Sequence, residues 1–183
     1  MDLNDMNSSA VQTDIAVPAI PAISVSAAVS LALLAYAVPL AMSYSTTPSP
    51  NHPQIMAWYL TLKQPKFKPP DIAIPVAWTL IETALAVAAY RLLRKPSSDS
   101  RTASLALLSG NVVAIGGWSR LFFGRQNLPA STLAAAAMVG TGAAYVSAAH
   151  PVDALASSLG KPLVGWVAFA TVLTAAIWQR NRA

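Results

Sequence analysis

The chain has 183 residues, of which 55% are hydrophobic and only 10% are charged, whereas soluble domains carry about 25% charged residues. It contains no cysteine, which excludes disulfides, thiolate metal sites and a cysteine nucleophile. The net charge of +5 lies in short clusters at the ends of apolar runs, where anionic lipid headgroups explain it more simply than nucleic acid does. The composition therefore predicts an all-α, polytopic membrane protein and argues against nucleic-acid binding.

The first 22 residues differ from the rest of the chain. They contain Asp2, Asp5 and Asp14, two prolines and neither lysine nor arginine. A secretory signal needs a positively charged start, so we expect a disordered N-terminal tail over residues 1–22 and not a cleaved leader. The remaining residues, 23–183, are expected to form one membrane domain.

Five apolar stretches follow, each close to the roughly 20 residues that a helix needs to cross a bilayer. Asp71 is expected to cap the second stretch, His150-Pro151 to end the fourth, and a polar turn through Lys161 to precede the fifth. Five spans joined by short turns predict a five-transmembrane-helix bundle. The expected spans are 23–43, 71–93, 103–123, 130–149 and 162–179.

The long first loop, residues 44–70, ends in an aromatic, basic and proline-rich segment. Prolines fix φ and lack an N–H, so this segment is predicted to be a stiff lid over a pocket. Its lysines can anchor to lipid phosphates or pair with the carboxylates of a ligand, and both roles are compatible. The predicted lid residues are Trp58, Tyr59, Lys63, Pro65, Lys66, Phe67, Lys68, Pro69 and Pro70.

Several motifs in this order resemble the TspO/MBR family, which includes the translocator proteins and tryptophan-rich sensory proteins. The first loop reads WYxxLxxPxFxPP from Trp58, the second span opens with Pro-Val-x-Trp-Thr, and the third ends with Trp-Ser-x-x-Phe-Phe-Gly. The final span reads PxxxWxxFATxLxxxIW from Pro162. The resemblance covers about residues 57–181, and the first span fits by position only.

This resemblance implies a five-helix bundle, commonly dimeric, that binds porphyrins, haem-related tetrapyrroles, sterols and synthetic aromatic ligands beneath the first loop. We therefore expect an integral, multi-pass membrane protein that binds a porphyrin or haem as a ligand, as a sensor or carrier. The alternatives are a light-dependent porphyrin-degrading enzyme, with Trp78 and Trp166 as participants, and a transporter of small amphipathic molecules. No cofactor is expected to be required.

The expected ligand contacts come from three helices. In the last span, spacings of three and four residues place four side chains on one face, and Trp118 and Phe122 share a face of the third span in the same way. For tryptophans near span ends, such as Trp58 and Trp178, the interfacial aromatic belt is the competing interpretation. The candidate ligand-binding residues are Trp78, Glu82, Trp118, Phe122, Trp166, Phe169, Ala170 and Leu173.

Glu82 departs from the family pattern, in which this position is usually tyrosine. A carboxylate near the middle of a span costs about 2.5–3.5 kcal/mol on insertion scales, so it is expected to face the bundle. Asn111, Tyr36 and Thr174 are its candidate hydrogen-bond partners. Two roles remain open: a structural polar contact between helices, or a group that contacts the ligand or accepts a proton.

Metal and sterol sites have little support in the sequence. His52 and His150 are the only histidines and neither lies within a span, so no metal site is expected. The C-terminus lacks the tyrosine of the cholesterol-type pattern, so sterol recognition is disfavoured. A homodimer has a candidate face of small residues, which serves either packing within the bundle or contact between protomers: Ala136, Gly140, Ala144 and Ala148.

Overall fold

The computed structural model describes residues 23–182, which form six α-helices, one π-helical turn and no strand. Five helical stretches are long and apolar enough to cross a membrane, which confirms the predicted all-α, five-span membrane fold. They are α1 (Val25–Ser43), α3 (Ala73–Leu93), α4 (Asp99–Ser119) continued by the π-helical turn η1 (Arg120–Gly124), α5 (Leu128–Ala149) and α6 (Ala154–Arg180). The predicted disorder of residues 1–22 lies outside the described residues.

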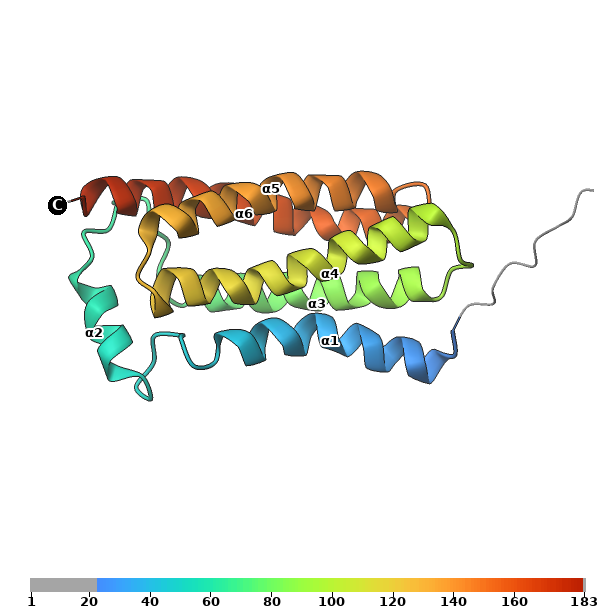
Figure 1. Cartoon of the computed structure of the whole chain (residues 1–183), viewed down its shortest axis with the longest axis horizontal. Coiled ribbons are helices and arrows are strands. Elements are labelled where there is room, and N and C mark those ends of the chain that lie inside the picture. The colour runs from blue at the N-terminus through green and yellow to red at the C-terminus, as the bar shows by residue number, and fades with distance from the viewer. Residues whose placement is uncertain (1–22, 183) are drawn as a thin grey trace, which may run out of the picture.

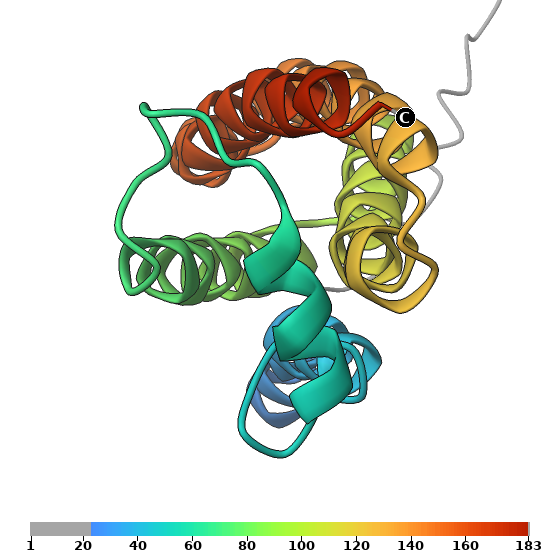
Figure 2. The same cartoon turned by 90° about the vertical axis from the view of Figure 1, so that its left-hand side faces the viewer.

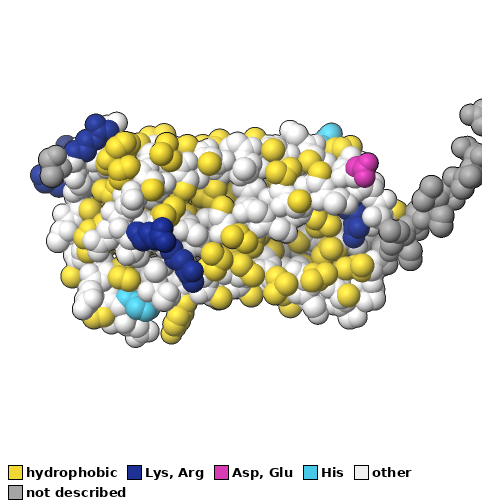
Figure 3. Space-filling model, viewed as in Figure 1, with side chains coloured by type: hydrophobic (Ala, Val, Ile, Leu, Met, Phe, Trp, Pro, Cys, Tyr) yellow, Lys and Arg dark blue, Asp and Glu magenta, His cyan; other side chains and the backbone are white. Residues whose placement is uncertain are grey.

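The five long helices form a ring in which each packs mainly against two neighbours, and a smaller contact joins α3 to α4 (Figures 1 and 2). Going around the ring, the order is α1, α3, α6, α5, α4 and back to α1. Large apolar side chains such as Leu80, Leu133 and Val172 point outward and are 60–70% exposed. On the face in Figure 3, basic side chains lie toward the two ends and hydrophobic side chains predominate between them, as expected of a surface that meets lipid.

Capping side chains begin four of the five spanning helices. Each accepts a hydrogen bond from a backbone N–H three residues later, which satisfies one of the free donors of the first turn. These caps are Ser24 for α1, Ser98 for α4, Asn127 for α5 and Asp153 for α6. The prediction that Asp71 caps α3 is wrong: α3 begins after Ile72 without a side-chain cap, because the Asp71 carboxylate bonds instead to Lys68 and Tyr59.

The first loop is more ordered than its composition indicates. Residues Pro53–Thr61 form a short helix, α2, which lies across one end of the bundle (Figure 2). Proline in the first turn is compatible with this helix because the first N–H groups have no partner within a helix. Trp58 and Tyr59 therefore lie on a helix and not in extended loop, and the irregular parts of the loop are residues 44–52 and 62–72.

The last helix begins eight residues before the predicted start. Residues 154–161 were expected to form a polar turn, yet they make the first two turns of α6, with Pro162 inside the helix. The Ser157 hydroxyl donates to the Val146 carbonyl of α5 at 2.7 Å, and Gly160 lies against the Tyr145 ring. Close packing on α5 thus overrides the turn-like composition of this segment.

The outer face of α5 carries the small-residue stripe. Ala136, Gly140 and Ala144 are exposed, and Ala148 is partly buried. The interpretation of these residues as packing positions inside the bundle is therefore wrong for the first three. They face lipid or a second copy of the chain, and the homodimer stays a prediction.

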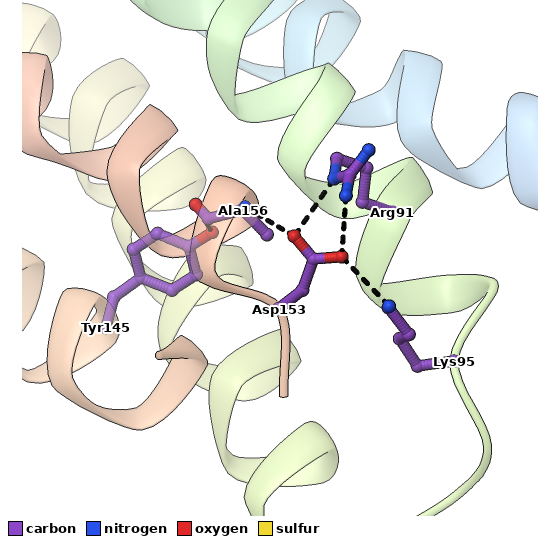
Figure 4. Close-up of polar contacts among 5 residues, drawn as sticks. All are labelled: Arg91, Lys95, Tyr145, Asp153 and Ala156. Carbon is purple, nitrogen blue, oxygen red and sulfur yellow. Dashed lines mark hydrogen bonds and ion pairs between the residues drawn. The ribbon is translucent and has the colours of Figure 1, made fainter. Parts of the chain in front are cut away.

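One ion-pair cluster joins the end of α3 to the start of α6, at the end of the bundle where the chain enters α1 (Figure 4). Asp153, whose side chain is only 2% exposed, accepts two hydrogen bonds of 2.9 Å from the Arg91 guanidinium of α3. Lys95 approaches the same carboxylate at 3.2 Å, and the Ala156 N–H donates to it at 2.8 Å. Because Arg91, then the Ala156 N–H and Lys95, favour the ionised form, the pKa of Asp153 lies below its ordinary value although burial acts in the opposite direction.

We predict that Gly160→Ala destabilises the bundle. A Cβ at Gly160 would lie 2.4 Å from Cε1 of Tyr145, and this ring is held in place by burial and by a 2.8 Å hydrogen bond from its hydroxyl to the Ala156 carbonyl. Overpacking of this kind costs about 1–3 kcal/mol. Thermal unfolding in detergent measures the effect. Gly140→Ala is the control, since a Cβ there meets nothing within 4 Å; equal melting temperatures for the two variants would contradict the prediction.

We predict that Asp153→Asn lowers the free energy of unfolding by about 2 kcal/mol at neutral pH, because it leaves Arg91 and Lys95 without their partner while asparagine can still cap α6. The value lies below that of a fully buried pair because the Arg91 and Lys95 side chains are 37% and 42% exposed. A carboxyl group whose pKa is lower in the folded than in the unfolded chain stabilises the folded state. This stabilisation is complete at pH values above the pKa in the unfolded chain, which is about 3.9. The difference between wild type and variant should therefore be constant from pH 5 to 7 and shrink below about pH 4. A difference that grows on acidification would contradict this assignment.

Candidate functional site

Beneath α2, five aromatic side chains from α2, α4 and η1 pack on one another. Trp118 and Phe122 stack with their centroids 5.0 Å apart and an interplanar angle of 18°. Trp58 meets Phe122 edge-on at 5.8 Å, and Tyr59 meets Phe123 at 5.7 Å. Offset and edge-to-face contacts of this kind are the favoured arrangements of aromatic pairs. The short helix is thereby attached to the bundle by its aromatic side chains.

A second aromatic group lies where α3 meets α6. The Trp78 and Trp166 rings are almost perpendicular, at 87°, with centroids 6.3 Å apart. Phe169, one turn further along α6, lies 5.5 Å from Trp166, and Phe67 of the lid lies 6.4 Å from Phe169. This group therefore runs from the α3–α6 contact to the underside of the lid.

A groove of about 310 Å³ opens between α3 and α6, with Trp166 in its wall. Gly165 contributes no side chain, and a Cβ added there would meet nothing within 4 Å. The groove is almost wholly apolar and opens sideways from the bundle. Its lining residues are Ala77, Leu80, Ile81, Pro162, Gly165 and Trp166.

The candidate ligand residues differ in how much side-chain surface they leave accessible to a ligand. Trp78, Trp118 and Trp166 pack, partly buried, against one core cluster that includes Ile81, Leu85 and Leu163. Phe122 and Leu173 are only 2% and 9% exposed, so they support the aromatic rings and offer almost no surface to a ligand. Phe169 and Ala170 are partly buried on α6.

Sequence reasoning missed most of the groove wall. Ala77, Leu80, Ile81, Pro162 and Gly165 carry no distinctive chemistry, and lipid-facing and groove-facing apolar residues look alike in a sequence. The available signal was Gly165 directly before Trp166, because a missing side chain beside an indole leaves room for a ligand.

Glu82 lies on α3 one turn beyond Trp78 and is partly buried. Its expected hydrogen bonds are not made: Asn111 bonds to Leu107 and Thr141, and Thr174 bonds to backbone carbonyls of its own helix. Tyr36 likewise forms no hydrogen bond with Glu82 among residues 23–182. Glu82 is not part of the groove wall, so its carboxyl is a polar group one turn from the indole contact.

The lid is fastened at both of its ends. Asn181, just after α6, accepts from the Lys63 N–H at 2.9 Å and donates to the Lys63 carbonyl at 3.2 Å. Lys68 pairs with Asp71 and donates to the Tyr59 hydroxyl at 3.3 Å. Burial lowers the pKa of Lys68, but Asp71 and Tyr59 outweigh it and the net pKa is raised. Pro65 is buried, which holds the middle of the lid against the bundle.

The three lid lysines are therefore not equivalent. Lys68 is 14% exposed and paired, whereas Lys63 and Lys66 are exposed and join none of the ion pairs found among residues 23–182. Lys63 and Lys66 are the two that can meet an anionic group. In the same part of the chain, no three His, Cys, Asp or Glu side chains lie close enough to hold a metal ion.

Comparisons with known proteins agree with this architecture. The sequence profile of the TspO/MBR family matches residues 28–179. The translocator protein of Sus scrofa is 27% identical over 127 residues, which cover 68% of this chain and 75% of the relative. The tryptophan-rich protein TspO of Chlorobaculum tepidum is 28% identical over 154 residues, covering 81% and 95%. The protein CrtK of Rhodobacter capsulatus is 27% identical over 126 residues, covering 68% and 79%. With the profile spanning all five membrane helices, the chain belongs to the TspO/MBR family.

Proposed function

We propose that this membrane protein binds a flat tetrapyrrole, such as protoporphyrin or haem, against Trp166 and Trp78 in the groove between α3 and α6. The observation that carries the proposal is the position of the Trp166 indole. It forms part of the wall of an apolar groove of about 310 Å³, and the Trp78 and Phe169 rings lie 6.3 Å and 5.5 Å from it. A planar aromatic ring matches such a wall because aromatic faces and edges attract one another beyond simple area burial.

The groove is open at its side, so a large ring is not restricted to the enclosed volume. One edge of a macrocycle can rest on Gly165 and Trp166 while the other edge meets lipid. The carboxylates of a porphyrin prefer to remain at the water boundary, where the exposed Lys63 and Lys66 can pair with them. The apolar wall thus suits the ring of such a ligand, and the exposed lysines of the lid suit its acidic side chains.

Binding of this type does not depend on iron. No histidine lies within a spanning helix, since His52 precedes α2 and His150 follows α5. Ring contacts and apolar burial then supply the affinity, so protoporphyrin and haem should bind similarly. A role as sensor or carrier follows from such reversible binding, and the name of the translocator relatives supports the carrier role.

We predict that Trp78→Phe and Trp166→Phe each weaken binding of protoporphyrin by about threefold to tenfold, the range expected when one aromatic contact worth ~0.5–1.5 kcal/mol is reduced. The measurement is a titration followed by the porphyrin's own absorption band, because protein fluorescence would change with the tryptophan count. Haem titrated in parallel should show the same order of affinities.

Trp178→Phe is the matched control for this titration. Trp178 lies three turns beyond Trp166 on the same helix, where it packs near Phe122 and under the Arg182 guanidinium at 4.4 Å. Its replacement should leave the affinity unchanged. If all three variants bind protoporphyrin as the wild type does, the ligand does not use the α3–α6 groove and the proposal fails.

We predict that Glu82→Gln folds normally and binds protoporphyrin about threefold to tenfold more tightly than the wild type. A ring placed against Trp78 also covers part of the Glu82 side chain, which lies one turn further along α3, and covering an ionisable carboxyl costs more than covering a neutral amide. Thermal unfolding checks the fold, and the same absorption titration checks the affinity. Superimposable titrations of the two proteins would remove Glu82 from the ligand site.

A further inference from the structure

The last turn of α3 carries a second candidate site, at the end of the bundle opposite the lid. Arg91 lies in the last turn of α3, Arg94 caps the helix and Lys95 follows it directly. Together with Tyr90 and Asp153 they line a pocket of about 260 Å³. This pocket shares no residue with the α3–α6 groove.

The charges in this pocket do not balance. Counting residues 23–182 alone, three cationic side chains and one carboxylate line the pocket, which leaves two positive charges. Asp153 holds Arg91 and Lys95 beside each other, at 2.9 Å and 3.2 Å from the same oxygen atom. Arg94 is exposed, and within residues 23–182 its guanidinium makes one hydrogen bond, of 2.5 Å, from Nη1 to the Ile23 carbonyl. The guanidinium of Arg94 therefore retains donors that can serve an anion.

The position of the pocket indicates which kind of anion it can bind. It lies where α3 ends, beside the start of α1, at the level where apolar helices give way to polar loops. Tyrosine, here Tyr90, and basic residues are typical of this boundary, where lipid headgroups lie. Guanidinium groups bind phosphate oxygens through paired, charge-assisted hydrogen bonds.

From this charge and position we propose that Arg91, Arg94 and Lys95 form a binding site for the phosphate group of an anionic phospholipid. Asp153 acts as a positioning residue, since it keeps Arg91 and Lys95 together and fixes them against the α5–α6 turn. Arg94 supplies guanidinium donors that residues 23–182 leave unused. A lipid held there would contact α1 and α3 at the end of the bundle that lacks the lid.

The test is a lipid titration of the full chain in detergent, followed by native mass spectrometry, with phosphatidylglycerol as the anionic probe and phosphatidylcholine as the zwitterionic one. The wild-type protein should bind phosphatidylglycerol at least fivefold more tightly than phosphatidylcholine. Arg94→Gln should weaken this binding about fivefold, whereas Arg94→Lys, which keeps the charge, should retain most of it. Arg180→Gln is the matched control, because it removes the same charge from an exposed position at the opposite end of the bundle.

The outcomes are distinguishable. If Arg94→Gln and Arg180→Gln weaken phosphatidylglycerol binding equally, the lipid is attracted by the overall positive charge and not by this pocket, and the proposal is overturned. Equal affinity of wild type for the two lipids, with displacement of both by inorganic phosphate, would assign the pocket to free phosphate and also overturn it. Protoporphyrin binding by Arg94→Gln should equal that of wild type, which shows that the variant is folded and that the two sites are separate.

Discussion

The Asp153 carboxylate is the contact on which the arrangement of the bundle depends. It is nearly inaccessible to water and joins the end of α3 to the turn between α5 and α6. Through this contact α3 and α6, which are distant in sequence, are fixed side by side at one end (Figure 4). A buried carboxylate that lost its cations would be strongly unfavourable, so the helices cannot separate there without a large penalty.

Toward the other end the same pair of helices is held by different chemistry. Small residues, Ala77 and Gly165, leave space between α3 and α6, and the Trp78–Trp166 contact bridges it. The lid then closes this end through Asn181 and through the Lys68–Asp71–Tyr59 group. At one end, polar side chains hold α3 and α6 close together. Further along, aromatic side chains join the two helices but do not fill the space between them, and this space is the groove.

Much of this fold follows from the sequence, because the length of an apolar run and the cost of unpaired backbone groups in lipid leave few alternatives to a bundle of helices. The aromatic motifs likewise indicate which helices carry Trp78, Trp118 and Trp166. Contacts between distant segments were not predictable. Residues 154–161 resemble a turn by composition and become helical through packing on Tyr145 and Val146. Asp71 resembles a cap, yet an ion pair with Lys68 is available to it at the same position.

Helix α3 runs between the two ends of the molecule, so its polar side chains lie in different surroundings along its length. Its first half carries Trp78 and its middle carries Glu82. Its last turn carries Arg91, and Arg94 and Lys95 follow at its end. If Arg91, Arg94 and Lys95 served only to anchor the chain to anionic lipid, a carboxylate among them would weaken the anchor, because Asp153 lowers the net positive charge of the cluster. The pairing is explained by positioning: it orders two cations and simultaneously sets the position of α3 against α6. The position of α3, and with it the groove beside Trp166, is therefore fixed by Arg91 and Lys95, two of the residues that we propose to bind a lipid phosphate.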